Sequence, residues 1–169
     1  MIHLAYLLLG ANLGDRAHTL QQAVARLAKR TGTIRQLSPI YETAPWGLTD
    51  QPAFLNQVVA IETTQPAEVL LGQMQAIELA LGRVRHEHWG ARTIDIDLLY
   101  YDDLVQQTPT LTLPHPYLHE RRFTLVPLAD VAPDYRHPIL GKTTTELLAG
   151  CPDAGAVTIF NSPTIRPPH

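Results

Sequence analysis

The sequence lacks features that would place it in several common functional classes. Its 169 residues include one cysteine, Cys151, so no disulfide can form within the chain, and we expect a cytoplasmic protein. The formal net charge of −3 argues against a general nucleic-acid or membrane-surface binder. The apolar start, Met1 to Leu9, has no basic n-region and is too short to span a bilayer. We therefore expect no nucleic-acid partner and no membrane association.

Glycine-rich phosphate loops are also absent. Gly141-Lys142-Thr143 lacks the upstream glycine of a P-loop, and Gly10 to Gly14 does not match a dinucleotide fingerprint. Any nucleotide must therefore be held by side chains and metal ions.

The apolar residues present follow the periodicities of strands and helices. They predict strands over residues 4–9, 34–41, 53–63 and 93–101, with helices between Asp15 and Gly32 and from Pro66 to Gly82. This order predicts an α+β, ferredoxin-like βαββαβ sandwich with an antiparallel central sheet. Extra C-terminal elements are expected as a partial helix over 121–131 and a short helix over 143–149. We expect one domain over residues 1–160 and a proline-rich tail over 161–169.

Two aspartates stand out in the strand predicted over 93–101. Because strand side chains alternate between faces, Asp95 and Asp97 share one face, and Ile94, Ile96 and Leu98 share the other. Paired carboxylates are typical Mg²⁺ ligands, and two ions could clamp the attacking and leaving groups of a phosphoryl transfer. The alternative is a solvated strand face, although aspartate is depleted in strands. Oxygen ligands favour Mg²⁺ over zinc.

Three arginines lie in the loop that precedes these aspartates. The guanidinium groups of Arg83, Arg85 and Arg92 can bind phosphate oxygens in a bidentate manner. Each arginine taken alone could instead form a surface salt bridge, for example with Glu78 or Glu87. Beside two acidic metal ligands, the loop as a whole favours a polyphosphate site.

Histidines and aromatic residues complete the polar clusters. His115 and His119 have the spacing of helical zinc ligands, but the adjacent prolines oppose a helix and no zinc is predicted. His115 is better suited to a phosphate. Aromatic rings near the loops could stack on a flat heterocycle, with core packing as the alternative. Asn56 shares a strand face with Phe54 and could read the edge of such a heterocycle.

Ordered sequence blocks resemble the 6-hydroxymethyl-7,8-dihydropterin pyrophosphokinase family of folate biosynthesis. The most specific block is His88-x-Gly90-Ala91-Arg92-x-x-Asp95-Ile96-Asp97-Leu98-Leu99. Further blocks are Gly10-x-Asn12-Leu13-Gly14-Asp15, Tyr41-x-Thr43-x-Pro45-x-Gly47, Gln51-Pro52-x-Phe54-x-Asn56, Glu78-x-x-x-Gly82-Arg83 and Pro114-His115.

The resemblance implies that pyrophosphate is transferred from ATP to the pterin hydroxymethyl group, with release of AMP. It implies two Mg²⁺ ions on Asp95 and Asp97, and catalytic roles for these aspartates and for Arg83 and Arg92. The implied ATP-binding residues are Gln75, Glu78, Arg85, Trp89, Arg92, Leu98, Thr112, His115 and Arg121. The implied pterin-binding residues are Thr43, Ala44, Trp46, Phe54, Asn56 and Phe123.

Some residues depart from the family pattern. Ala44 replaces a common proline, Trp46 replaces a smaller residue, and Pro116 follows His115 where an aromatic residue is common. We expect a monomer acting on ATP and the pterin. The alternatives are another metal-dependent phosphotransferase or phosphohydrolase, a ferredoxin-like RNA-binding module, and a degenerate pterin-binding subunit.

Overall fold

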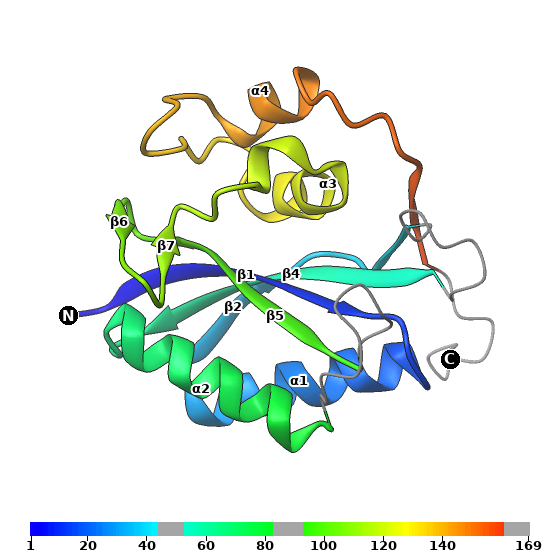
Figure 1. The fold of residues 1–169 in the computed structure, drawn as a ribbon, viewed down its shortest axis with the longest axis vertical. Coiled ribbons are helices and arrows are strands. Elements are labelled where there is room, and N and C mark those ends of the chain that lie inside the picture. Colours follow the sequence, from blue (N-terminus) through cyan, green and yellow to red (C-terminus); the bar gives the residue numbers. More distant parts are fainter. Residues whose placement is uncertain (44–52, 83–92, 161–169) are drawn as a thin grey trace.

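The computed structural model describes residues 1–43, 53–82 and 93–160. These residues form a six-stranded main sheet, a two-stranded sheet and several helices (Figure 1). In chain order the elements are β1 (His3–Ala11), α1 (Arg16–Arg30), β2 (Thr33–Leu37), β3 (Tyr41–Thr43), β4 (Phe54–Thr63), α2 (Ala67–Ala80), β5 (Asp95–Tyr101), β6 (Gln106–Gln107), β7 (Thr112–Leu113), the 3₁₀ turn η1 (Leu118–Glu120), α3 (Arg122–Val131), α4 (Thr144–Ala149) and β8 (Val157–Ile159).

The main sheet has the order β5-β1-β4-β3-β8, and β2 also pairs with β4. Every one of these pairings is antiparallel, so the predicted ferredoxin-like arrangement is confirmed. α1 and α2 lie on one face of the sheet, while α3 and α4 lie on the other (Figure 1). We call these the α1/α2 face and the α3/α4 face.

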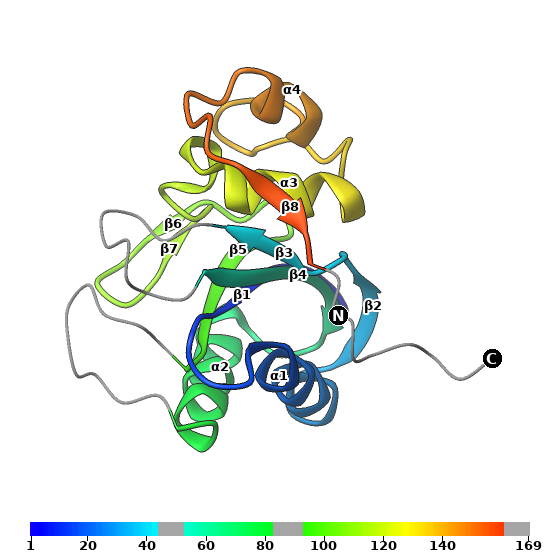
Figure 2. The same ribbon diagram turned by 90° about the vertical axis from the view of Figure 1, so that its right-hand side faces the viewer.

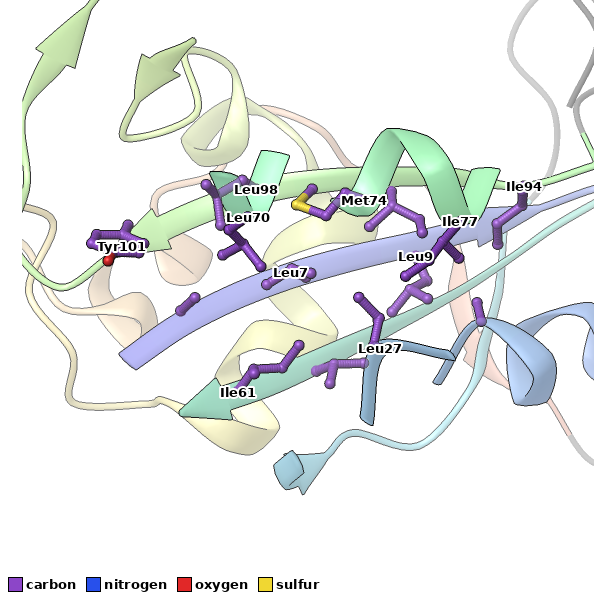
Figure 3. Packing of buried hydrophobic residues seen from close by; sticks show 14 of the residues in the cluster. Leu7, Leu9, Leu27, Ile61, Leu70, Met74, Ile77, Ile94, Leu98 and Tyr101 are labelled. Atoms are coloured by element: carbon purple, nitrogen blue, oxygen red, sulfur yellow. The ribbon is translucent and has the colours of Figure 1, made fainter. Parts of the chain in front are cut away.

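The α1/α2 face is the larger apolar core. The helical spacing of Leu20, Ala23 and Leu27 buries one stripe of α1, and Asp15 caps that helix by accepting a hydrogen bond from the His18 amide at 3.2 Å. This core lies between the sheet and the helices α1 and α2 (Figure 3). It includes Leu7, Leu9, Leu27, Ile61, Leu70, Met74, Ile77, Ile94, Leu98 and Tyr101. Its inclusion of Ile94, Ile96 and Leu98 confirms the predicted alternation along β5.

The α3/α4 face has a second, smaller core beneath α3. Leu125 and Leu128 of α3 pack there with Leu8, Val58 and residues of α4. The pairing of β1 with β5 is irregular between Tyr6 and Leu7, and both Leu99 and Tyr100 join this face.

One predicted strand is wrong in its extent. The strand expected over 34–41 is divided into β2 and β3 at Ser38-Pro39-Ile40. The Ser38 hydroxyl accepts a hydrogen bond from the Val58 amide at 2.9 Å, in place of a backbone acceptor. Pro39 has no amide hydrogen to donate, so regular pairing with β4 stops there.

The C-terminal part contains both expected and unexpected elements. α3 continues through Pro127, and α4 begins after Thr143, whose side chain forms a capping box with Glu146. The short strands β6, β7 and β8 were not predicted. Figure 2 shows β8 beside β3 at the edge of the sheet. None of the described helices is long and apolar enough to cross a membrane.

Candidate active site

Four residues from four neighbouring strands form a continuous row across the sheet. Tyr41 of β3 pairs with Asn56 of β4, Asn56 pairs with Gly10 of β1, and Gly10 pairs with Asp95 of β5. Neighbouring strands lie about 4.8 Å apart, so the backbones of Asn56 and Asp95 are about 10 Å apart. We call these four residues the polar row. The polar row places Asn56, which we expect to bind the pterin, close to Asp95, which we expect to bind the metal ions.

Gly10 keeps the middle of the polar row open. A Cβ atom at this position would lie 2.8 Å from Nδ2 of Asn56, so any side chain would push the amide aside. Sequence reasoning placed Gly10 in a turn and assigned it no role in the site. The available signal was a glycine at the end of an apolar strand, which often marks a close approach of a ligand or another backbone.

Two buried oxygen atoms beside the polar row have no hydrogen-bond partner among the described residues. They are Oδ1 of Asn56 and Oγ1 of Thr43. The Asn56 amide nitrogen donates to the Leu9 carbonyl oxygen at 3.4 Å, which orients the side chain. A buried polar atom without a partner costs about 1–3 kcal/mol, so a ligand that hydrogen-bonds these atoms would recover that cost.

Aromatic residues lie close to the same part of the sheet. Phe54 pairs with Thr43 across β3 and β4, and strand alternation places both on the face of Asn56. Phe123 lies in the first turn of α3, with its ring 5.7 Å from the Arg121 guanidinium carbon. Thr43, Phe54 and Asn56 thus lie on the α3/α4 face of the sheet, and Phe123 lies in α3, the helix that covers this face.

A tyrosine that sequence reasoning did not place in the site fixes the helix above it. The Tyr41 hydroxyl donates a short hydrogen bond to Oδ2 of Asp130 near the end of α3. Burial raises the pKa of Tyr41 to about 12, and the bond to Asp130 acts in the same direction. Tyr41 therefore remains a neutral donor and links β3 to the helix that carries Phe123.

The two aspartates of β5 supply the metal-binding chemistry. Asp95 and Asp97 are half-buried on the α3/α4 face, and Asp97 pairs with Leu8 in the row next to the polar row. Within residues 1–43, 53–82 and 93–160, no group of three or more His, Cys, Asp or Glu side chains could hold a metal ion. Two carboxylates alone do not suit zinc, but they suit Mg²⁺, which fills its other positions with water and phosphate oxygens.

His115 lies close enough to Asp95 to respond to its charge. Burial and, to a smaller extent, the Arg121 cation lower the pKa of His115 to about 4, while the Asp95 carboxylate acts in the opposite direction. Nδ1 of His115 accepts a hydrogen bond from the Tyr117 amide at 3.2 Å, so the ring proton of the neutral form is on Nε2. The His115 amide donates to the Leu99 carbonyl at 3.0 Å and ties this segment to β5.

The remaining described ATP candidates have diverse environments. Glu78 is 7% exposed, and its carboxylate accepts a hydrogen bond from the Ile96 amide at 2.8 Å, which supports the edge strand β5. Gln75 is exposed on α2, and Thr112 is half-buried in β7. The Leu98 side chain is buried in the α1/α2 core, so only its main chain could meet a nucleotide.

Six predicted site residues lie outside the described residues. They are Ala44, Trp46, Arg83, Arg85, Trp89 and Arg92. Their roles stay predictions from the sequence.

Comparison with known proteins identifies the family. The model of the family described as 7,8-dihydro-6-hydroxymethylpterin-pyrophosphokinase (HPPK) matches residues 6–133. The chain belongs to this family. The predicted activity, pyrophosphoryl transfer in folate biosynthesis, is therefore confirmed at the level of the HPPK family.

Relatives from several bacteria have the same name, 2-amino-4-hydroxy-6-hydroxymethyldihydropteridine pyrophosphokinase. The Methylorubrum extorquens protein is 47% identical over 152 residues, which cover 89% of this chain and 95% of the relative. The Pseudomonas aeruginosa protein is 42% identical over 156 residues, which cover 92% of this chain and 96% of the relative. The chain thus matches nearly the full length of both HPPK relatives.

Solved HPPK-DHPS structures share the fold. The Plasmodium falciparum HPPK-DHPS wild type with pteroate has a TM-score of 0.73 at 18% identity, over 89% of this chain and 42% of that one. An HPPK-DHPS in complex with substrates also has a TM-score of 0.73, at 17% identity, over 89% of this chain and 43% of that one. The chain therefore spans less than half the length of these two-part proteins and resembles their HPPK fold.

Proposed function

We propose that this protein transfers pyrophosphate from ATP to 6-hydroxymethyl-7,8-dihydropterin and releases AMP. The observation that carries the proposal is the polar row. On one face of the sheet, it places the Asn56 amide, which can hydrogen-bond a heterocycle, near the Asp95 carboxylate, which can bind a metal ion, with only Gly10 between them. The single cysteine suits a reducing cytoplasm as the site of action. We propose a monomer in which residues 1–160 form one domain and 161–169 a tail.

The pterin is proposed to bind on the β3/β4 side of the polar row. Its ring N–H groups would meet Oδ1 of Asn56, whose buried acceptor has no partner among the described residues, with Oγ1 of Thr43 close by. Phe54 and Phe123 would pack against the ring. From the sequence resemblance, Ala44 and Trp46 complete the pterin set.

ATP and Mg²⁺ are proposed to bind on the β5 side. Asp95 and Asp97 would hold two Mg²⁺ ions, which neutralise charge on the phosphate oxygens when bound. His115 would donate its neutral Nε2 hydrogen, and Arg121 would add positive charge beside it. The family resemblance adds a list of further ATP residues: Gln75, Glu78, Arg85, Trp89, Arg92, Leu98 and Thr112.

In the proposed reaction, the pterin hydroxyl oxygen attacks the β-phosphorus of ATP. The bond from that phosphorus to the oxygen bridging it to the α-phosphate breaks, and AMP leaves with the bridging oxygen. The hydroxyl proton passes to a carboxylate oxygen of Asp97 or to water. Arg83 and Arg92 are proposed to stabilise the negative charge that develops on the transferred group.

The test is to incubate the protein with ATP and Mg²⁺, with and without hydroxymethyl-dihydropterin, and to separate the adenine nucleotides. We expect AMP only when the pterin is present, in a 1:1 ratio to pterin pyrophosphate. Formation of ADP would indicate ordinary kinase action, and AMP or ADP without the pterin would indicate a phosphohydrolase. Retention on RNA without ATP binding would favour the RNA-binding alternative.

A further inference from the structure

Arg16 holds together two strands that carry proposed pterin residues. It is the first residue of α1, and its side chain is 23% exposed. One guanidinium nitrogen, Nη1, donates to Oε2 of Glu42 at 3.2 Å and to the Ala53 carbonyl oxygen at 2.7 Å. Glu42 belongs to β3, and Ala53 immediately precedes β4. The single side chain therefore connects the C-terminal end of β3 to the start of β4.

The position of this cation is locally unfavourable. The N-terminus of a helix carries partial positive charge, and α1 has no acidic residue in its first turn. The helix end is instead capped by the Asp15 side chain. Contacts from distant parts of the chain compensate, because Arg16 pairs with Glu42 and stacks on the Phe160 ring at 5.6 Å from its centroid.

The contacts of Arg16 act directly behind two of the proposed pterin residues. Glu42 is followed by Thr43, Ala53 is followed by Phe54, and Thr43 and Phe54 are paired in the sheet. Strand alternation places the Glu42 side chain on the α1/α2 face, whereas Thr43 and Phe54 point to the opposite face. Arg16 thus fixes the backbone of both residues from the far side of the sheet.

We propose that Arg16 is a positioning residue for the pterin. It sets the separation and register of Thr43 and Phe54, and it touches neither substrate. This inference rests on the proposed function, since it assumes that the pterin binds beside these two residues. It predicts that loss of Arg16 affects the pterin far more than ATP, because Asp95 and Asp97 lie on β5, which β1 separates from β4.

The test compares Michaelis constants for both substrates in wild type, Arg16→Ala, Arg16→Lys and Glu42→Gln. We expect Arg16→Ala to raise KM for the pterin about tenfold, since a displacement near 1 Å can have effects of this size, and to change KM for ATP less than about twofold. Arg16→Lys should raise the pterin KM about threefold, because lysine keeps the charge but its nitrogen lies one bond closer to the main chain than the guanidinium nitrogen that makes both hydrogen bonds. Glu42→Gln should have a similar, smaller effect, because the bond to Ala53 remains.

The matched control is Arg35→Ala. Arg35 also forms an ion pair with a strand residue, Glu62, at 3.1 Å, but it lies on β2 and away from the polar row. Both Michaelis constants should stay at wild-type values in this variant. Melting temperatures recorded for every variant separate loss of stability from loss of pterin affinity.

Two results would overturn the inference while leaving the proposed function intact. One is an active wild type with an Arg16→Ala variant that melts earlier but keeps its pterin KM. The other is an equal rise of both Michaelis constants. If Arg16→Ala does not fold, the same criteria apply to Arg16→Lys and Glu42→Gln. A wild type that forms no AMP with the pterin refutes the proposed function and the inference together.

Discussion

The two faces of the main sheet use the same strands for opposite purposes. On the α1/α2 face, β1, β4 and β5 contribute aliphatic side chains to a closed core, in which Leu7, Leu9 and Ile61 are fully buried. On the α3/α4 face, the same three strands contribute Gly10, Asn56 and Asp95 at one end and a smaller apolar core at the other. A shift of one residue along any strand would exchange these roles.

This difference shows how stability and function can be separated within a single sheet. The α1/α2 face supplies the apolar burial that fixes strand register, and burial is the main favourable contribution to folding. The polar end of the α3/α4 face then holds groups such as Oδ1 of Asn56, whose burial costs some of the free energy of folding. Substitutions on the α1/α2 face should therefore lower stability, whereas substitutions in the polar part of the α3/α4 face should lower activity.

The largest effect is expected from Asp97→Ala on the α3/α4 face. This change should lower kcat by about 10³-fold or more, because it removes a carboxylate proposed to hold Mg²⁺ against the transferred phosphates, while pterin affinity stays nearly intact. Steady-state AMP release and pterin titration measure the two quantities. Asp103→Asn, which alters an exposed carboxylate just after β5, is the control and should stay active. Near-normal turnover of Asp97→Ala would contradict the assignment.

On the α1/α2 face, Leu7→Ala should lower stability and leave the Michaelis constants unchanged. Leu7 is fully buried, so its truncation should lower the free energy of unfolding by about 2–5 kcal/mol. Leu79→Ala, at a position that is 72% exposed, should change it by less than about 0.5 kcal/mol. Urea denaturation measures both. A large change in either Michaelis constant for folded Leu7→Ala would break the separation between the faces.

Gly10→Ala tests whether the middle of the polar row must stay open. The new Cβ would lie 2.8 Å from Nδ2 of Asn56, so we expect KM for the pterin to rise about tenfold through displacement of the amide. Gly72→Ala is the matched control: a Cβ there meets nothing within 4 Å, and it should stabilise α2 by about 0.5–1 kcal/mol without changing activity. Unchanged pterin kinetics in Gly10→Ala would remove Gly10 from the site.

The smallest expected effect concerns the charge of His115. Its pKa of about 4 lies below the ordinary value of 6.5, so between these values the unfolded chain binds more protons than the folded protein. The contribution of His115 to stability is therefore intact above pH 6.5 and declines as the pH falls toward 4. An NMR titration should place the midpoint near 4, and His115→Gln should flatten this part of the stability profile. A midpoint near 6.5 would contradict the lowering of the His115 pKa by burial.

Much of the fold could be predicted because periodicity and local signals agreed. The stripe of Leu20, Ala23 and Leu27 and the Asp15 cap predicted α1, and alternation along β5 placed Asp95 and Asp97 on one face. Pro39 predicted an edge or irregular position in the strand expected over 34–41, but not its full division, which also depends on the Ser38 hydroxyl accepting a hydrogen bond from Val58 of β4. β8 was also missed, since a strand of three residues gains its stability from pairing with β3.

The site was predictable in residue types but not in arrangement. Asn56 and Asp95 were both assigned from the sequence, yet their alignment through Gly10 depends on the register of β1 with two neighbours. Tyr41 and Arg16 act through partners far along the chain, Asp130 and Glu42, so no local pattern revealed them. Burial of His115, which keeps it neutral, likewise depends on tertiary packing.

The most direct test of the central claim is to locate the metal relative to the polar row. Mn²⁺, which also suits carboxylate and phosphate ligands, can be added with ATP to isotope-labelled protein, and its line broadening recorded by NMR. We predict stronger broadening of the Asn56 side-chain amide than of Gln57, whose side chain points to the other face and donates to the Ser38 carbonyl at 2.9 Å. The broadening should disappear in the double variant Asp95→Asn, Asp97→Asn. Equal broadening of both amides, or broadening that survives the double variant, would contradict the account.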